Sequence, residues 1–322
     1  MEQRTILVTG GLGLIGHNVV AQLESLGHPV IITDIQTNYG LVPQAELDYL
    51  IAERRKKIST DKIFRIDIAD QFGIDWLVAK YQPDTIIHMA SFPRQKVVNA
   101  NPQLGSRAMS EGLLNLLEAS KKHHVGKFLY ISSSMVYGDF TDDVTETAEC
   151  RPQGQYGIMK LAGEWLVRDY TRSSGIAHTI IRPSAVYGPL DVEDRVIAKF
   201  MLTAMRGGTL KVNGAGETLD FTYVDDAANG IVSAALSSNT NNKTYNITKS
   251  HSRSLLDAAN LAVKIVGKGT IEVRDKDADF PSRGALNIDA ACRDFGYSPQ
   301  VDVEEGFQAY YEWLSNSTYW KP

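Results

Sequence analysis

Cysteine is scarce in this sequence. Only Cys150 and Cys292 occur in 322 residues, and they show neither a pairing pattern nor the spacing of metal ligands. We therefore expect no disulfide framework, no metal site and a protein that works in the reducing cytoplasm.

Long apolar runs and an excess of basic residues are also missing. No stretch approaches the roughly 18 apolar residues of a membrane-spanning helix, so we expect no membrane partner. Lys+Arg total 33 against 38 Asp+Glu, a formal net charge of -5, which argues against a nucleic-acid partner. The basic run 54–57 is interpreted as a solvated helix surface.

The first 180 residues alternate short β-branched runs with helical patterns, which indicates buried parallel strands joined by helices. Helices are expected at about 15–26, 113–123 and 156–171. The order predicts the α/β class, as a Rossmann-type doubly wound parallel sheet. The expected strands cover residues 5–8, 30–33, 63–66, 85–87, 128–131 and 179–181.

After Pro189 the pattern loosens, with helices expected near 196–206 and 226–236 and a strand at 221–224. We predict a dinucleotide-binding domain over 1–182, which takes back about 217–248. A smaller C-terminal α/β domain over 183–322 would bind the substrate at the carboxyl ends of the strands.

The first strand runs into Gly10, Gly13 and Gly16, followed at once by a helix. Each glycine has a task at a pyrophosphate site: a tight turn, close approach of the backbone to the ligand, and close packing of helix on strand. With Leu14 and Ile15 at the start of the helix, this segment predicts a dinucleotide site.

Carboxylates at the ends of the next strands extend this site. Asp34 lies 18 residues beyond Gly16, where it can accept both ribose hydroxyls of the adenosine. No Arg or Lys follows within a dozen residues, so NAD is favoured over NADP; a turn-forming role for Asp34 is the alternative. Asp67 and Ile68 are expected at the adenine, although Asp67 could instead be a helix cap.

Tyr156 and Lys160 stand four residues apart on one predicted helix face. A phenol with a pKa of ~10 becomes a base near neutral pH only if its anion is stabilised. An ammonium at ~4 Å, in an effective dielectric of ~20, supplies about 4 kcal/mol. The preceding strand ends in Ser132-Ser133-Ser134, which offers a third catalytic hydroxyl.

Several motifs follow one another along the chain: the glycine loop, His88-Met89-Ala90, Ser133 before Val136-Tyr137-Gly138, Tyr156 with Lys160, Arg182-Pro183, Val186-Tyr187-Gly188-Pro189, Asp220-Phe221 and Val224-Asp225-Asp226. In this order they resemble the extended short-chain dehydrogenase/reductases, in the nucleotide-sugar epimerase/dehydratase group. The resemblance implies that Met89, Ala90 and Ser91 also contact NAD, together with Lys160. It implies a nucleoside-diphosphate sugar as substrate and oxidation of a sugar hydroxyl by Tyr156, with Ser133 sharing the proton.

Within that group, the residues after the catalytic hydroxyl distinguish the reactions. The 4,6-dehydratases carry acids there and the decarboxylases a Glu at the second position, whereas this chain has Ser134 and Met135. The 3,5-epimerases use a Cys that this stretch lacks. The sequence therefore predicts a 4-epimerase. The alternatives are a keto-sugar reductase or dehydrogenase, and a non-catalytic NAD-binding regulator.

Departures from the family pattern leave the substrate contacts open. Ala185, Leu219 and Met109 replace the usual Asn, Arg and Asn, so other cations must hold the diphosphate. The basic residue that uronate 4-epimerases carry after Tyr-Gly-Pro is Val192, which favours a neutral or deoxy sugar. The expected substrate contacts are Lys96, Arg195, Arg283, Ser133, Ser134, Tyr156 and Tyr187, of which the three cations could equally be surface charges.

Relatives of this kind pair two long helices across a two-fold axis. The apolar positions of 113–123 and 165–170 could form such a face, so we expect a homodimer. The alternative is that these positions pack only inward.

Overall fold

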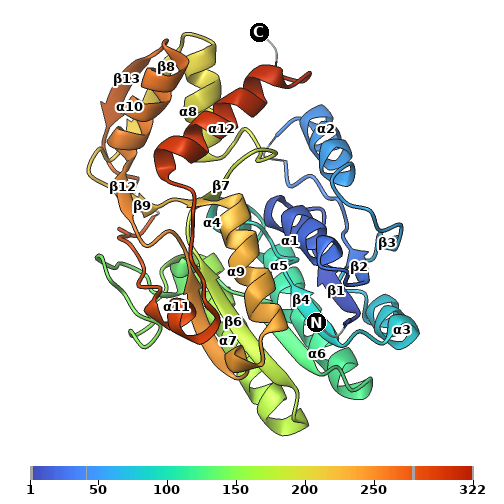
Figure 1. The fold of residues 1–322 in the computed structure, drawn as a ribbon. Coiled ribbons are helices and arrows are strands. Elements are labelled where there is room, and N and C mark those ends of the chain that lie inside the picture. The colour runs from blue at the N-terminus through green and yellow to red at the C-terminus, as the bar shows by residue number, and fades with distance from the viewer. Residues whose placement is uncertain (1–2, 41, 278–279, 321–322) are drawn as a thin grey trace.

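The computed structural model describes residues 3–40, 42–277 and 280–320. In these ranges seven strands form a parallel sheet in the order β11-β6-β5-β4-β1-β2-β3 (Figure 1). The predicted α/β class and doubly wound sheet are confirmed. The strands are β1 (Ile6–Thr9), β2 (Val30–Thr33), β3 (Ile63–Phe64), β4 (Thr85–His88), β5 (Lys127–Ile131), β6 (Ala177–Pro183) and β11 (Lys243–Ile247).

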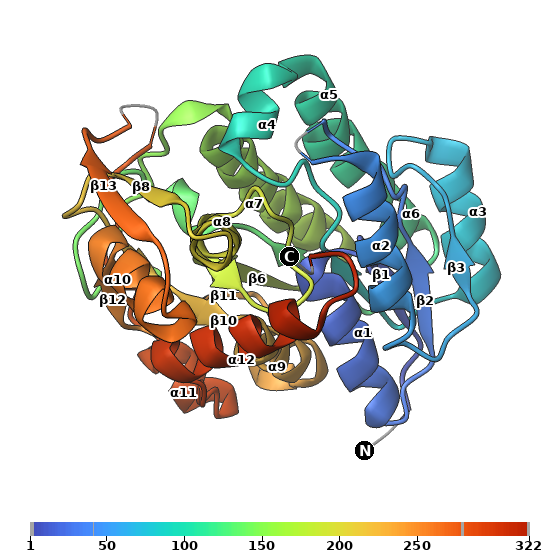
Figure 2. The same cartoon turned by 90° about the horizontal axis from the view of Figure 1, so that it is seen from above.

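Helices cover both faces of the sheet, as the view from above shows (Figure 2). Successive side chains of a strand point to opposite faces. Val8 therefore packs with α1 and α9 on one face, and Leu7 packs with α3, α6 and α7 on the other. The covering helices are α1 (Leu14–Ser25), α9 (Val224–Leu236), α3 (Gln71–Tyr81), α6 (Gly112–Lys122) and α7 (Gly154–Ser174).

A second layer lies over the carboxyl ends of the central strands (Figure 1). It has its own apolar core, in which Phe221, Phe307 and Tyr310 are buried. The pairs β8/β13, β9/β12 and β7/β10 stand apart from the central sheet. This region contains β7 (Val186–Tyr187), α8 (Val196–Met205), β8 (Thr209–Asn213), β9 (Thr218–Asp220), β10 (Thr222–Tyr223), β12 (Ser252–Ser254), α10 (Leu255–Val266), β13 (Thr270–Arg274) and α12 (Val303–Asn316).

The remaining elements lie mostly between strands of the central sheet along the chain. Among the described residues, no helix is long and apolar enough to cross a bilayer. The connecting elements are α2 (Gln44–Arg55), α4 (Gln95–Ala100), α5 (Pro102–Ser106), the π-helical turn η1 (Arg107–Glu111), the 3₁₀ turns η2 (Ser134–Val136) and η3 (Ser238–Thr240), and α11 (Asp289–Phe295).

Three sequence expectations need correction. The strand expected at 63–66 ends at Phe64. The strand expected at 221–224 is only Thr222–Tyr223, because α9 begins at Val224. The run 54–57 is not wholly solvated, since Arg54 is only 5% exposed and its guanidinium donates to two backbone carbonyls.

The apolar side chains of 113–123 and 165–170 divide between the interior and the surface. Leu113, Leu116 and Leu117 on α6 are fully buried in the core of this chain. On α7, Trp165 is 65% exposed. Any apolar face offered outward therefore comes from α7 rather than from these leucines.

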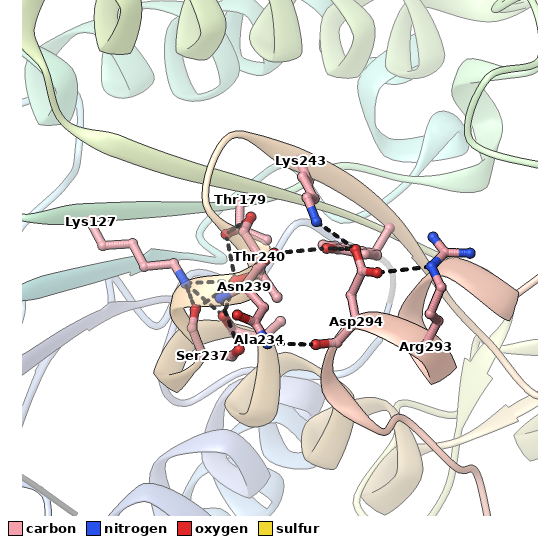
Figure 3. Close-up of polar contacts among 10 residues, drawn as sticks. Lys127, Thr179, Ala234, Ser237, Asn239, Thr240, Lys243, Arg293 and Asp294 are labelled. Carbon is pink, nitrogen blue, oxygen red and sulfur yellow. Dashed lines mark hydrogen bonds and ion pairs between the residues drawn. The ribbon is translucent and has the colours of Figure 1, made fainter.

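A polar cluster around the start of β5 and the C-terminal end of α9 holds β11 and α9 in place (Figure 3). Lys127, at the start of β5, donates to the Ala234 carbonyl at 2.7 Å and to the Thr240 hydroxyl at 2.8 Å. A cation at this point also faces the negative C-terminal end of α9. On β11, Lys243 pairs with Asp294 of α11 at 2.8 Å. These contacts return a segment from the second half of the chain to the edge of the central sheet.

Candidate active site

One cavity of about 1560 Å³ lies between the carboxyl edge of the sheet and the C-terminal layer. It opens where the strand order reverses, between β1 and β4, as expected for a ligand site of a doubly wound sheet. Every residue that the sequence analysis assigns to a site lines it: Gly10, Gly13, Leu14, Ile15, Gly16, Asp34, Asp67, Ile68, Met89, Ala90, Ser91, Lys96, Ser133, Ser134, Tyr156, Lys160, Tyr187, Arg195 and Arg283.

The glycine loop brings backbone to the floor of this cavity. Gly10 has φ +71°, and a Cβ there would lie 2.8 Å from the Ala90 nitrogen. At Gly16 a Cβ would collide with the Gly10 carbonyl oxygen. Helix α1 begins at Leu14 after Gly13, and no side chain caps its N-terminus. Its free N–H groups and positive dipole end suit a pyrophosphate.

Asp34 follows β2 at one end of the cavity. Its Oδ2 accepts the Leu12 N–H at 2.9 Å, and its Oδ1 accepts the Gln36 N–H at 2.8 Å. Burial raises the pKa of Asp34, while the two backbone N–H groups act to lower it. A carboxylate that keeps free lone pairs beside the glycine loop fits ribose hydroxyls as partners.

The part of the cavity where the sequence predicts adenine is built from the ends of β1, β4 and β3. The hydroxyl of Thr9 accepts the N–H groups of Met89 and Ala90 at 3.2 and 3.1 Å, which fixes the turn after β4. Asp67 accepts the Ala69 N–H at 2.9 Å. That bond makes a local turn, while the cap of α3 is Asp70.

The three predicted catalytic side chains converge in the middle of the cavity. Ser133 follows β5 and accepts the Met135 N–H at 3.2 Å. Tyr156, in the first turn of α7, lies close enough to Ser133 for a hydrogen bond from this side chain to lower the pKa of the phenol. One turn later, the Lys160 ammonium donates to the Ile131 carbonyl at 2.8 Å and lies 5.8 Å from the Tyr156 ring centre.

The charges on these groups differ from the simple sequence argument, which put an ammonium ~4 Å from the phenol. Burial raises the pKa of Tyr156, while the Ser133 hydrogen bond and the Arg195 charge lower it. Burial lowers the pKa of Lys160 to about 7, against the Glu164 charge. In this arrangement, Ser133 and Arg195 are thus the groups that favour the tyrosinate.

A buried ion pair below the catalytic residues was not predicted from the sequence. Glu164, fully buried on α7, accepts Arg182 Nε at 2.9 Å and Nη2 at 2.7 Å, and the Ser132 hydroxyl at 2.6 Å. Burial opposes ionisation of Glu164, but the hydrogen bonds and charge of Arg182 prevail and lower its pKa. The pair fixes the rotation of α7, and hence Tyr156, relative to β5 and β6. The Arg182-Pro183 motif was its only sequence signal.

The three cations that the sequence analysis expects at the substrate all line the cavity. Arg195 Nε lies 3.6 Å from Asp191 Oδ2. Burial lowers the pKa of Arg283 to about 10. Lys96 is more exposed and lies 3.7 Å from Asp194.

Two other expected contacts have partners of their own. Ser134 donates to the Ser184 hydroxyl at 3.2 Å. The Tyr187 hydroxyl points toward the Val303 carbonyl at 3.5 Å, into the C-terminal core. Arg94, which sequence reasoning missed, lines the cavity and lies 3.1 Å from Asp194.

Comparisons with known proteins agree with this geometry. The model of the NAD dependent epimerase/dehydratase family matches residues 6–248. The chain belongs to this family. An uncharacterized UDP-glucose epimerase of Bacillus subtilis is 29% identical over 97% of this chain and 98% of its own length. A dTDP-glucose 4,6-dehydratase of Neisseria meningitidis is 28% identical over 99% and 95%. The crystal structure of UDP-glucuronic acid 4-epimerase from Bacillus cereus, with UDP-glucuronic acid and NAD, has a TM-score of 0.87 at 28% identity, over 96% and 98% of the two chains.

The cofactor of this epimerase/dehydratase family is NAD, and the uncapped helix start and Asp34 fit it. Among the described residues, no group of three or more His, Cys, Asp or Glu could hold a metal ion. Two of the three departures from the family pattern, Ala185 and Leu219, line the cavity, whereas Met109 is buried in an apolar cluster with Phe92. A diphosphate in this cavity would therefore need donors other than these three positions.

Proposed function

We propose that this chain is an NAD-dependent nucleotide-sugar 4-epimerase. The observation that carries the proposal is the turn after β5, where Ser133 reaches Tyr156 while Ser134 and Met135 place no carboxylate beside it. A dehydratase needs an acid there to eliminate water. The UDP-glucose epimerase of Bacillus subtilis and the UDP-glucuronic acid 4-epimerase support the same reading.

Each catalytic side chain then has a definite role. NAD, when bound, would supply reversible hydride chemistry at C4 of the sugar, with no net reduction of the sugar. Tyr156 removes the proton of the sugar hydroxyl and later gives it back. Ser133 shares that proton by hydrogen bond, and the Arg195 charge lowers the pKa of the phenol. Lys160, held at the Ile131 carbonyl, remains a predicted catalytic residue.

We assign NAD to residues 1–182 with about 217–248, and the nucleotide sugar to residues 183–322. Arg195, Arg283 and Lys96 are the proposed diphosphate contacts, since all three line the substrate side of the cavity. Ser134 and Tyr187 remain predicted sugar contacts, and a neutral or deoxy sugar the predicted substrate.

Proton NMR of the protein with UDP-, dTDP-, GDP- and CDP-sugars and catalytic NAD tests the reaction. Conversion of one sugar into its C4 epimer, without net NADH, is the expected result. Formation of a 4-keto-6-deoxy sugar would show a dehydratase instead. Tyr156→Phe should keep NAD bound and lose at least ~10²-fold in turnover; near-normal turnover would remove Tyr156 from its role.

The alternative is a keto-sugar reductase or dehydrogenase of the same family. It would leave the sugar panel unchanged until NADH or NADPH is supplied in stoichiometric amount. A non-catalytic NAD-binding regulator is disfavoured, because a binding module has no need of Ser133, Tyr156 and Lys160 together.

We also propose a homodimer built on α7. Ile158 and Trp165, two turns apart on this helix, are 53% and 65% exposed, and together they form an apolar strip on one helix face that a second copy could cover. Trp165→Glu should convert a dimer to a monomer in light scattering, and an unchanged mass would refute this face.

A cytoplasmic location remains our prediction, favoured by two free cysteines.

A further inference from the structure

One buried arginine connects the two halves of the cavity. Arg54 is the last but one residue of α2, and its side chain is almost fully buried. Its Nη1 donates to the Leu12 carbonyl at 2.9 Å, and its Nη2 donates to the Leu190 carbonyl at 2.7 Å. Leu12 belongs to the glycine loop, and Leu190 belongs to the segment 188–195 between β7 and α8, which we call the sugar loop.

On the cofactor side, Arg54 provides the second of two hydrogen bonds that hold the backbone of Leu12. The Leu12 N–H donates to Asp34 and its carbonyl accepts from Arg54. Both polar groups of Leu12 are thus fixed, directly before Gly13 at the start of α1. The orientation of the pyrophosphate site and of the ribose carboxylate depends on this arrangement.

On the sugar side, Arg54 holds a strained residue. Leu190 has φ +70°, a left-handed conformation that is unfavourable for a side chain with a Cβ. The next residue, Asp191, is 4% exposed and pairs with Arg195, which lines the cavity with Tyr156. Backbone strain of this kind persists only where surrounding contacts enforce it.

The same helix holds the sugar loop at a second point. Glu46, fully buried near the start of α2, accepts the Glu193 N–H at 2.6 Å. Three buried polar atoms around this contact, Arg54 Nε, Glu46 Oε2 and the Tyr310 hydroxyl, have no hydrogen-bond partner among the described residues. Since unpaired buried groups are costly, a shift of the loop that pairs them would be favourable.

We propose that Arg54 is a positioning residue that couples the two ligands: NAD on the glycine loop orders the sugar loop through Arg54, and a nucleoside diphosphate on the sugar loop strengthens NAD binding in return. The coupling must be reciprocal because it is a difference in binding free energies. This proposal rests on the proposed function only for the identity of the two ligands that fill the two halves of the cavity.

Hydrogen exchange of the full chain, with and without NAD as the only ligand, tests this coupling without any turnover. In the wild type, NAD should slow exchange in both the glycine loop and the sugar loop, the latter at least about five-fold. In Arg54→Met, protection of the sugar loop should fall below about two-fold. Lys56→Met, at a 69% exposed side chain two residues away, is the matched control and should behave as wild type.

A second variant separates coupling from simple unfolding. Arg54→Lys keeps the buried cation but can reach only one carbonyl at a time, so it should give intermediate protection of the sugar loop. Unchanged exchange in β4 and β5 shows that each variant is folded. Equal protection of the sugar loop in wild type and Arg54→Met would overturn the proposal, as would the absence of any sugar-loop protection in the wild type. If NAD protected neither loop, both the cofactor assignment and the coupling would be refuted. If the chain bound NAD but did not epimerise any sugar, the proposed function would fail while the coupling measured by hydrogen exchange would still stand.

Discussion

A buried histidine far from the cavity should make the fold sensitive to acid. His178 on β6 is 8% exposed, and its Nδ1 lies 2.7 Å from the Thr171 hydroxyl. Burial, with a smaller contribution from the Arg168 charge, lowers its pKa from 6.5 to about 4. Below pH 6.5 the unfolded chain therefore binds a proton at this histidine that the folded chain does not bind. The free energy of unfolding consequently decreases as the pH is lowered.

The size of the effect follows from the pH interval. Between pH 6.5 and 5 the unfolded histidine is protonated and the folded one is not, and each pH unit is worth about 1.4 kcal/mol. His178 should thus cost about 2 kcal/mol on going from pH 7 to pH 5. His178→Gln keeps a hydrogen-bonding group for Thr171 but cannot titrate, so this variant should lose about 2 kcal/mol less than the wild type.

The assay is urea unfolding at pH 7, 6 and 5 with saturating NAD. The comparison must be between wild type and variant, because Asp34 and Asp220, whose pKa values burial raises, contribute with the opposite sign. His124→Gln, at an exposed position, is the control and should follow the wild type. Parallel pH curves for wild type and His178→Gln would refute the reasoning.

Three further changes test the cofactor site and the fold. Asp34→Ala should relax the preference for NAD over NADP, measured as the ratio of the two dissociation constants, because it removes the charge that repels a 2′-phosphate; an unchanged ratio would assign the ribose to another group. Gly16→Ala should abolish NAD binding in calorimetry, because the new Cβ meets the Gly10 carbonyl oxygen; retained affinity would contradict that packing. Lys127→Met should lower the free energy of unfolding by about 3 kcal/mol, since it leaves two backbone carbonyls and a hydroxyl without their buried cation; a change below about 1 kcal/mol would show that other contacts hold β11.

The sequence was sufficient where chemistry and chain order coincide. Gly10 and Gly13 lie between a buried strand and a helix, and Gly16 lies in the first turn of that helix. Their task could therefore be predicted from local conformation alone. Tyr156 and Lys160 share one helix face for the same reason. The strand-end position of Ser133 needed only the rule that the carboxyl ends of parallel strands meet at one edge of the sheet.

The electrostatics of the site could not be predicted in this way. The spacing of Tyr156 and Lys160 brings the two side chains to one face, but it does not say which acceptor the ammonium takes. The structure gives it the Ile131 carbonyl, and it places Arg195, from a segment 35 residues beyond Lys160, close enough to act on the phenol. Long-range electrostatics of this kind depend on tertiary packing, which residue spacing does not encode.

The burial of Arg54 could not be predicted from the sequence either. In a run of four basic residues, exposure is the expected state of each, because a buried charge is costly unless it is paired. What makes burial affordable here is a pair of backbone carbonyls, Leu12 and Leu190, one before and one long after the helix in the chain. Every residue has a carbonyl, so the sequence carries no mark of the two that are used. A buried arginine satisfied by backbone is therefore invisible to pattern analysis. Because it joins segments that only the fold brings together, it is also well placed to connect two ligand sites.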